Sequence, residues 1–252
     1  MIQAVKNLCG ALLARDPIRR ARSRYRLLEA IADRAGFRLH NQNLAWLEDE
    51  DYLAAWNEFG ESDGRVKDRK FVLYSMVRSL ASVPGDTAEC GVFNGGSSHL
   101  ICRARLDRPD SLHHAFDSFE GLSEPDAPDL PSDPTAFRWR KNDLSVPLEV
   151  VRANLARFPN VRYHRGWIPE RFHEVEDRRF AFVHVDVDLF QPTLDSIAFF
   201  YPRLEAGGVL LCDDYGFTTC PGSRRAFDEF LADKPEGRVV HLATGQGFVV
   251  KR

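Results

Sequence analysis

The chain has 252 residues, of which 34 are Lys or Arg and 37 are Asp or Glu, so its formal net charge is −3. Hydrophobic residues make up 44% and charged residues 28%, which excludes wholesale disorder, collagen and coiled coil. No apolar run approaches the roughly 20 residues of a membrane span, and the charge offers no general attraction for nucleic acid. The length favours one large α/β domain with appendages, and we expect a soluble enzyme that has no membrane span and binds no nucleic acid.

The cysteines and the N-terminal segment bear on the compartment. The five cysteines are odd in number and show no C-x-x-C spacing, so a reducing cytoplasm is the simplest interpretation. Residues 1–26 hold seven Lys or Arg against one acid, Asp16, which does not fit a signal peptide. This segment is either a basic helix that docks on a membrane surface or an acidic partner, or a solvated helix outside the domain.

The predicted elements follow in chain order. Residues 18–57 are expected to be helical, residues 60–69 to form an exposed loop and residues 71–81 to form a helix. Strands are then predicted over 87–92, 113–116, 161–164, 180–187, 208–212, 239–242 and 247–251. Helices are predicted over 97–106, 146–156, 192–203 and 223–234. This alternation predicts βαβ units and a mostly parallel sheet over 71–252, preceded by a helical N-terminal extension over 1–70.

A Pro-rich insertion interrupts the alternation. Residues 122–147 contain five of the chain's 14 prolines. A stretch of this length inside a compact domain is usually a lid or a binding loop, or else poorly ordered. We expect a lid.

The first strand runs into a glycine turn, ECGVFNGGSS at 89–98. Glycines between a strand and a helix let a ligand approach the backbone, but the spacing is not the G-x-G-x-x-G of dinucleotide sites. The second strand ends in Asp117, an acid placed to hold ribose hydroxyls. Glu89 beside the turn would repel a pyrophosphate and suit an amino group, which favours S-adenosylmethionine over NAD as the cofactor.

Four acids follow two neighbouring strands. Asp186 and Asp188 end one buried run, and Asp213 and Asp214 follow the next predicted strand. Four carboxylates at one edge of a sheet repel one another unless a cation neutralises them or some stay protonated. Oxygen ligands suit Mg²⁺, Mn²⁺ or Ca²⁺, so we expect a divalent metal site. The alternative, in which each acid caps a following helix, explains one or two of them.

Four segments in this order resemble the macrocin O-methyltransferase family: residues 84–98, 115–122, 184–190 and 201–216. The resemblance covers roughly residues 70–235. It implies a Rossmann-like class I methyltransferase fold, with a mostly parallel sheet flanked by helices. It also implies an enzyme that uses S-adenosylmethionine and Mg²⁺ or Mn²⁺ to methylate sugars of natural products.

The resemblance implies a role for each matching residue. The cofactor would be bound by the glycine-turn residues and two others: Glu89, Gly91, Gly95, Gly96, Ser97, Asp117 and Trp167. The metal would be held by Asp186, Asp213 and Asp214, and Asp188 would be the general base. Two positions depart from the family pattern. Phe93-Asn94 replaces an aromatic and a basic residue, and Phe190-Gln191 lies where acceptor contacts are expected.

We therefore expect in-line transfer of a methyl group to a hydroxyl of a sugar or glycoside. One alternative is a catechol-type O-methyltransferase acting on an aromatic vicinal diol, with a slot lined by Phe137, Trp139, Trp167 and Phe190. Another is a binding module that holds the cofactor without catalysis. Candidate acceptor contacts are His40, Tyr52, Trp56 and Arg225, and a homo-oligomer, a dimer or higher, is expected.

Overall fold

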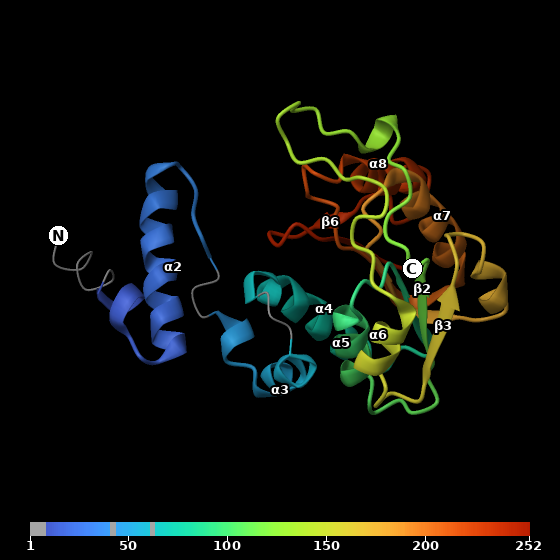
Figure 1. The fold of residues 1–252 in the computed structure, drawn as a ribbon, viewed down its shortest axis with the longest axis horizontal. Helices are drawn as coiled ribbons and strands as arrows, with labels where there is room; N and C mark the ends of the chain where they lie inside the picture. The colour runs from blue at the N-terminus through green and yellow to red at the C-terminus, as the bar shows by residue number, and fades with distance from the viewer. Residues whose placement is uncertain (1–8, 41–43, 61–63) are drawn as a thin grey trace. The chain divides into compact units, whose positions relative to one another are not determined.

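A computed structural model of the chain describes residues 9–40, 44–60 and 64–252 (Figure 1). The chain divides into two compact units, Met1–Asn57 and Glu58–Arg252. The boundary therefore lies earlier than the residue 70 expected from the sequence, because the helix that follows packs on the α/β unit. None of the described helices is long and apolar enough to cross a membrane.

The first unit holds helix α2 (Pro17–Arg34), the 3₁₀ turn η1 (Ala45–Leu47) and most of helix α3 (Glu50–Phe59). Helix α2 begins where the Asp16 side chain accepts the Ile18 N–H at 2.9 Å, and none of its residues is buried. The predicted continuous helix over 18–57 is thus two helices. Gly36 ends the first region with φ +81°, a backbone conformation that glycine adopts without strain.

The second unit is built on a seven-stranded sheet with the order β3-β2-β1-β4-β5-β7-β6. The strands are β1 (Asp86–Cys90), β2 (His113–Asp117), β3 (Val161–Arg165), β4 (Phe180–Val185), β5 (Leu204–Cys212), β6 (Val240–His241) and β7 (Gly247–Val250). The first five are parallel, and β7 pairs antiparallel with both β5 and β6. The predicted mostly parallel sheet is confirmed.

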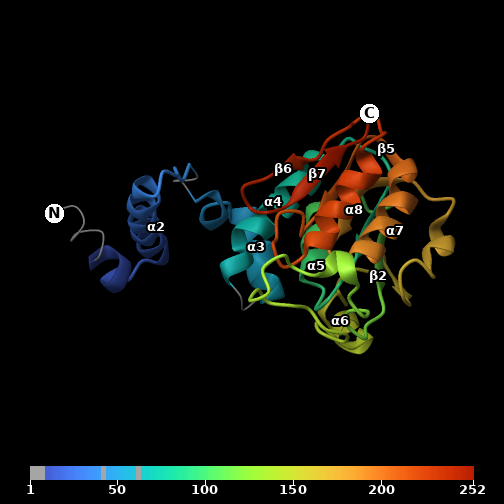
Figure 2. The same cartoon turned by 90° about the horizontal axis from the view of Figure 1, so that it is seen from above.

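The helices of this unit pack in pairs. Helix α4 (Lys67–Ser79) contacts α5 (Gly96–Ala104), and α7 (Phe190–Phe200) contacts α8 (Pro221–Leu231), which Figure 2 shows side by side. Helix α6 (Leu148–Asn154) precedes β3. Short 3₁₀ turns are η2 (Gly64–Val66), η3 (Ala127–Asp129), η4 (Phe172–Val175) and η5 (Tyr201–Arg203). All six residues of β4 are buried, as expected for a central parallel strand covered on both faces.

Residues 61–63 of the exposed loop predicted over 60–69 lie outside the described residues, and helical structure begins before residue 69. Helix α4 begins at Lys67 and buries Leu73, Tyr74 and Val77 on one face. Because those apolar residues tie the helix to the core, Arg69 and Lys70 lie on a helix rather than in a loop. This difference changes the composition of the site described below.

Candidate active site

A cavity of about 790 Å³ lies where β1, β2, β4 and β5 end. Strand order reverses between β1 and β4, the position at which open α/β sheets bind ligands. Nine of the residues predicted from the sequence line it: Gly91, Gly96, Ser97, Asp117, Trp167, Asp186, Asp188, Asp213 and Asp214. Glu89 and Gly95 are not among the lining residues.

Two backbone turns form the floor of the cavity. Gly91 has φ +84°, and a Cβ there would lie 1.9 Å from the carbonyl oxygen of Asp186. Only glycine therefore lets the turn after β1 approach the turn after β4 this closely. Asp117 stabilises the same turn, since its carboxylate accepts the N–H groups of Val92 at 2.7 Å and Phe93 at 3.3 Å. Burial raises the pKa of Asp117 despite these hydrogen bonds.

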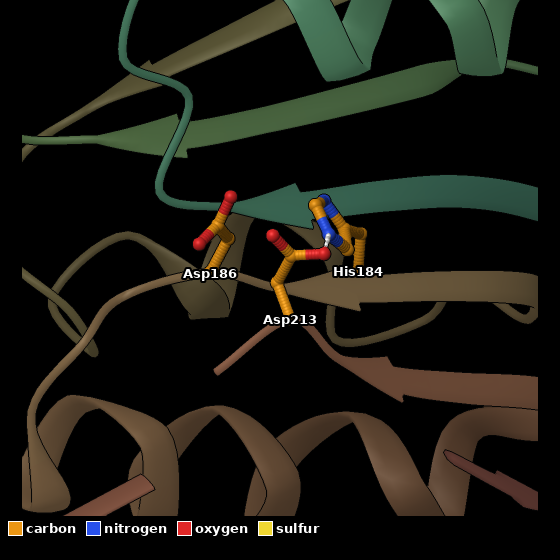
Figure 3. A group of neighbouring side chains, drawn as sticks. All are labelled: His184, Asp186 and Asp213. Carbon is orange, nitrogen blue, oxygen red and sulfur yellow. Dashed lines mark ion pairs between the residues drawn. The ribbon is translucent and has the colours of Figure 1, made fainter. Parts of the chain in front are cut away.

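Glu89 lies behind the cavity wall. Its side chain is 1% exposed, accepts a hydrogen bond from Ser98 Oγ and lies 2.9 Å from Nδ1 of His184. His184 Nε2 in turn lies 3.3 Å from Oδ1 of Asp213 (Figure 3). The Glu89 side chain thus lies against a buried histidine of a neighbouring strand, and its contact with a cofactor stays a prediction.

The buried side chains of Glu89, His184 and Asp213 stabilise one another in their charged forms. Burial lowers the pKa of His184, but the neighbouring carboxylates of Asp213 and Glu89 outweigh burial and raise it to about 9. For Glu89, burial raises the pKa, and the bond with His184 more than offsets this. The His184 imidazolium therefore lies between two carboxylates and orients the Asp213 side chain.

The four strand-end acids form two sets with different neighbours. Asp186 and Asp213 have ligand atoms within 4.8 Å of one another and of His184 (Figure 3), and Asp188 and Asp214 make an equally close set with a third residue, Cys220. Sequence reasoning expected one cluster of carboxylates. The structure brings all four to one cavity and adds a nitrogen donor to one set and a sulfur donor to the other.

Two cations from helix α4 reach this cluster. The Arg69 guanidinium pairs with the Asp213 carboxylate, lies 3.8 Å from Asp214 Oδ1 and stacks 4.4 Å from the centre of the Phe217 ring. Lys70 Nζ donates to Ser97 Oγ at the start of α5. The sequence analysis missed both cations because it assigned residues 60–69 to a loop and began the following helix at Phe71.

The acids are not fully neutralised by these cations. Burial raises the pKa of Asp186 and of Asp214, and burial with the neighbouring Asp186 raises that of Asp188 to about 7. Asp213 is the exception, because Arg69 lowers its pKa in spite of burial. Asp214 Oδ2 is buried without a hydrogen-bond partner. Crowded carboxylates with an unsatisfied oxygen fit a hard divalent cation.

His184 and Cys220 were also missed, although His184 carried a signal. It precedes Asp186 by two residues, and alternate residues of an extended strand point to the same face. Cys220 lies six residues beyond Asp214, and nothing in its local pattern predicts that the chain returns to the acids.

The Pro-rich segment forms one wall of the cavity. Leu122, Ser123, Trp139 and Leu144 of this segment line it. Trp139 Nε1 donates to Cys220 Sγ at 3.2 Å, with Phe137 packed edge-on against its ring at 4.9 Å.

The remaining acceptor candidates lie in different places. Gln191 lines the cavity, whereas Phe190 and Arg225 are not among the lining residues and stack on each other at 5.3 Å. Tyr52 and Trp56 are buried residues of α3, in the first unit, and His40 is exposed in the same unit. Their relation to the cavity stays a prediction.

Strand order 3-2-1-4-5-7-6 with a ligand cavity at its switch point defines a class I methyltransferase fold, and solved O-methyltransferases share it. The model of the macrocin-O-methyltransferase family matches residues 65–236, and the chain belongs to that family.

Individual relatives support this assignment. The chain is 37% identical over 146 residues to 8-demethyl-8-(2,3-dimethoxy-alpha-L-rhamnosyl)-tetracenomycin-C 4'-O-methyltransferase of Streptomyces olivaceus, covering 55% of this chain and 56% of the relative. It is 32% identical to demethyldecarbamoylnovobiocin O-methyltransferase of Streptomyces niveus, covering 60% of each. The structure of the O-methyltransferase NovP aligns with a TM-score of 0.57 and 28% identity over 73% of this chain and 79% of that one. The matches thus span little more than half the length of the two Streptomyces relatives.

Proposed function

We propose that this chain is an S-adenosylmethionine-dependent O-methyltransferase that methylates a hydroxyl of a sugar or a sugar-containing natural product. The observation that carries the proposal is one cavity lined both by a glycine turn with Asp117 and by four strand-end acids. Family membership supports the reaction class. The rhamnosyl group in the name of the tetracenomycin relative supports a sugar acceptor.

The two ends of the cavity would bind the cofactor and the metal ion, respectively. The turn containing Gly91 and Gly96, with Asp117, Ser97 and Trp167, would bind the cofactor, which supplies the methyl group. Asp186, Asp213 and Asp214 would hold Mg²⁺ or Mn²⁺. Such an ion, when bound, lowers the pKa of a coordinated hydroxyl.

Asp188 would accept the proton of the acceptor hydroxyl. It lines the cavity, is 6% exposed, and its raised pKa suits a general base that works near neutral pH. The Pro-rich wall that carries Trp139 would exclude water and fix the acceptor, and we propose that it acts as a lid. We also propose that the active protein is a homo-oligomer.

An acceptor panel tests this proposal. Wild-type protein is incubated with S-adenosylmethionine and a set of glycosides and catechols, with Mg²⁺ or with excess EDTA. We expect methylated glycosides with Mg²⁺ and a large loss of rate in EDTA. Methylation of catechols alone would show that the acceptor is an aromatic diol rather than a sugar. Full activity in EDTA would show that the reaction needs no metal ion. Cofactor binding without turnover on any diol would favour a binding module.

A further inference from the structure

Asp188, Asp214 and Cys220 converge from three separate turns. Asp188 follows β4, Asp214 follows β5, and Cys220 directly precedes α8. All three are buried, with 6%, 7% and 2% exposure, and a ligand atom of each lies within 4.8 Å of the others. A sulfur and two carboxylates are thus brought together on one side of the cavity.

The spacing within this set fits metal coordination. Bonds of about 2.3 Å to sulfur and about 2.1 Å to oxygen at a tetrahedral angle place the two ligand atoms about 3.6 Å apart. Cys220 Sγ and Asp188 Oδ1 are separated by 3.4 Å. The same spacing serves a thiol hydrogen bond when no ion is present, so little movement separates the two states.

One further observation favours an ion in this set. Asp214 Oδ2 is buried without a hydrogen-bond partner, so one ligand oxygen is unsatisfied. The Arg69 guanidinium forms its close pair with Asp213, in the other set, and lies 3.8 Å from Asp214 Oδ1.

We propose that Asp188, Asp214 and Cys220 form a second cation site, which shares Asp214 with the proposed Mg²⁺ site and is selective for a thiophilic divalent ion such as Zn²⁺. A sulfur ligand selects softer ions than Mg²⁺, and three protein ligands with an open fourth position are typical of zinc sites that exchange a ligand. On binding, the Sγ–H bond breaks, the S–Zn bond forms and the proton passes to solvent, with no change of oxidation state.

Occupation of this site would inhibit methyl transfer. This consequence rests on the proposed function, because it assumes that Asp188 takes the hydroxyl proton, and a carboxylate bound to Zn²⁺ is a much weaker base. Trp139 would report the event, since its Nε1–H donates to the same sulfur at 3.2 Å. An ion at Cys220 would therefore alter the environment of one wall of the cavity.

Cobalt spectroscopy tests the site without any acceptor. The protein carries Cys9→Ser, which removes an exposed thiol from the first unit, and is titrated with Co²⁺, whose thiolate complexes absorb strongly in the near ultraviolet. We expect one thiolate–Co²⁺ band that Zn²⁺ displaces. Cys220→Ser should abolish the band, and Asp188→Asn should weaken Co²⁺ binding at least about tenfold. Cys102→Ser, which removes a buried thiol on α5, is the matched control and should retain it.

Two results would overturn the site. One is the absence of a thiolate band in the Cys9→Ser protein, which needs no further variant to fold and would leave only a thiol hydrogen bond. The other is a band of undiminished intensity in a folded Cys220→Ser protein, with folding checked by its thermal transition.

Inhibition is measured separately. Zn²⁺ should inhibit methyl transfer in the presence of Mg²⁺, EDTA followed by Mg²⁺ should restore it, and Cys220→Ser should require at least about tenfold more Zn²⁺. Equal sensitivity of Cys220→Ser would overturn the inhibitory role. If no acceptor is methylated at all, the proposed function fails while the cobalt band still decides the site.

Discussion

Arg69 is the cation most closely paired with the strand-end acids, so its removal tests the charge balance of the cavity. Arg69→Gln keeps a polar side chain and removes the charge. In the wild type the guanidinium pairs with the Asp213 carboxylate and donates to the Asp213 carbonyl oxygen at 3.1 Å. The two side chains are 20% and 4% exposed, so the pair is largely shielded from water.

The expected loss of folding free energy depends on the contacts that Asp213 retains in the variant. Removing one partner of a buried ion pair costs about 3 to 5 kcal/mol. Asp213 retains the Gln246 amide at 2.7 Å and His184 at 3.3 Å, and Arg69 is partly exposed, so we expect about 2 kcal/mol, below that range. For a protein of this size the thermal midpoint in EDTA should fall by about 4 to 8 °C. Bound Mg²⁺ would replace the lost charge, so it should stabilise the variant more than the wild type.

Calorimetric scans in EDTA and in saturating Mg²⁺ measure both effects. Arg78→Gln is the matched control, because Arg78 lies on the same helix but does not line the cavity. The reasoning is refuted if Arg69→Gln melts together with the wild type in EDTA, or if Mg²⁺ shifts both proteins equally.

Three further predictions concern the turn, the sheet and the cavity wall. Gly91→Ala should cost about 3 kcal/mol in urea unfolding, because its Cβ would meet the Asp186 carbonyl; a cost no larger than that of Gly36→Ala, where the space is open, would contradict this. The pKa of Asp86 is lowered, because hydrogen bonds from His114, Leu112 and Arg178 outweigh burial. Its contribution is therefore present above the unfolded pKa of about 3.9 and is lost as pH falls through the folded value. Asp86→Asn should therefore make the free energy of unfolding fall less steeply as pH is lowered, and an unchanged slope would contradict this role of Asp86. Trp139→Ala should lower the acceptor kcat/KM about tenfold and Trp139→Phe much less, if the ring packs on the sugar; equal losses would assign the effect to the indole N–H.

The sequence predicts much of the fold because its signals are local. Strand-like runs that alternate with helix-like runs predict a parallel sheet, and strand ends place Asp117, Asp186 and Asp213 at one edge. These three residues do line one cavity. The antiparallel pairing of β7 with β5 depends on contacts between distant segments, and the local pattern does not reveal it.

The parts of the site that escaped prediction are those set by tertiary contacts. The pairing of Glu89 with His184 joins two adjacent strands and has no local signal, and the predicted contact of Glu89 with a cofactor amine stays a prediction. Arg69 was hidden in a segment rich in charges and glycine, and only the packing of α4 shows that it faces Asp213. Cys220 contacts Asp188 because of the turn that precedes α8, and the sequence pattern does not predict the conformation of this turn.

Methyl transfer by Asp188→Asn protein tests the central claim most directly. Wild type and variant are given S-adenosylmethionine with an isotopically labelled methyl group, Mg²⁺ and a glycoside that the wild type accepts, and labelled methyl ether is quantified by mass spectrometry. Calorimetry confirms that both proteins bind the cofactor. The account predicts labelled ether on a sugar hydroxyl with the wild type and a loss of at least about a hundredfold with the variant. Equal rates for the two proteins would contradict it.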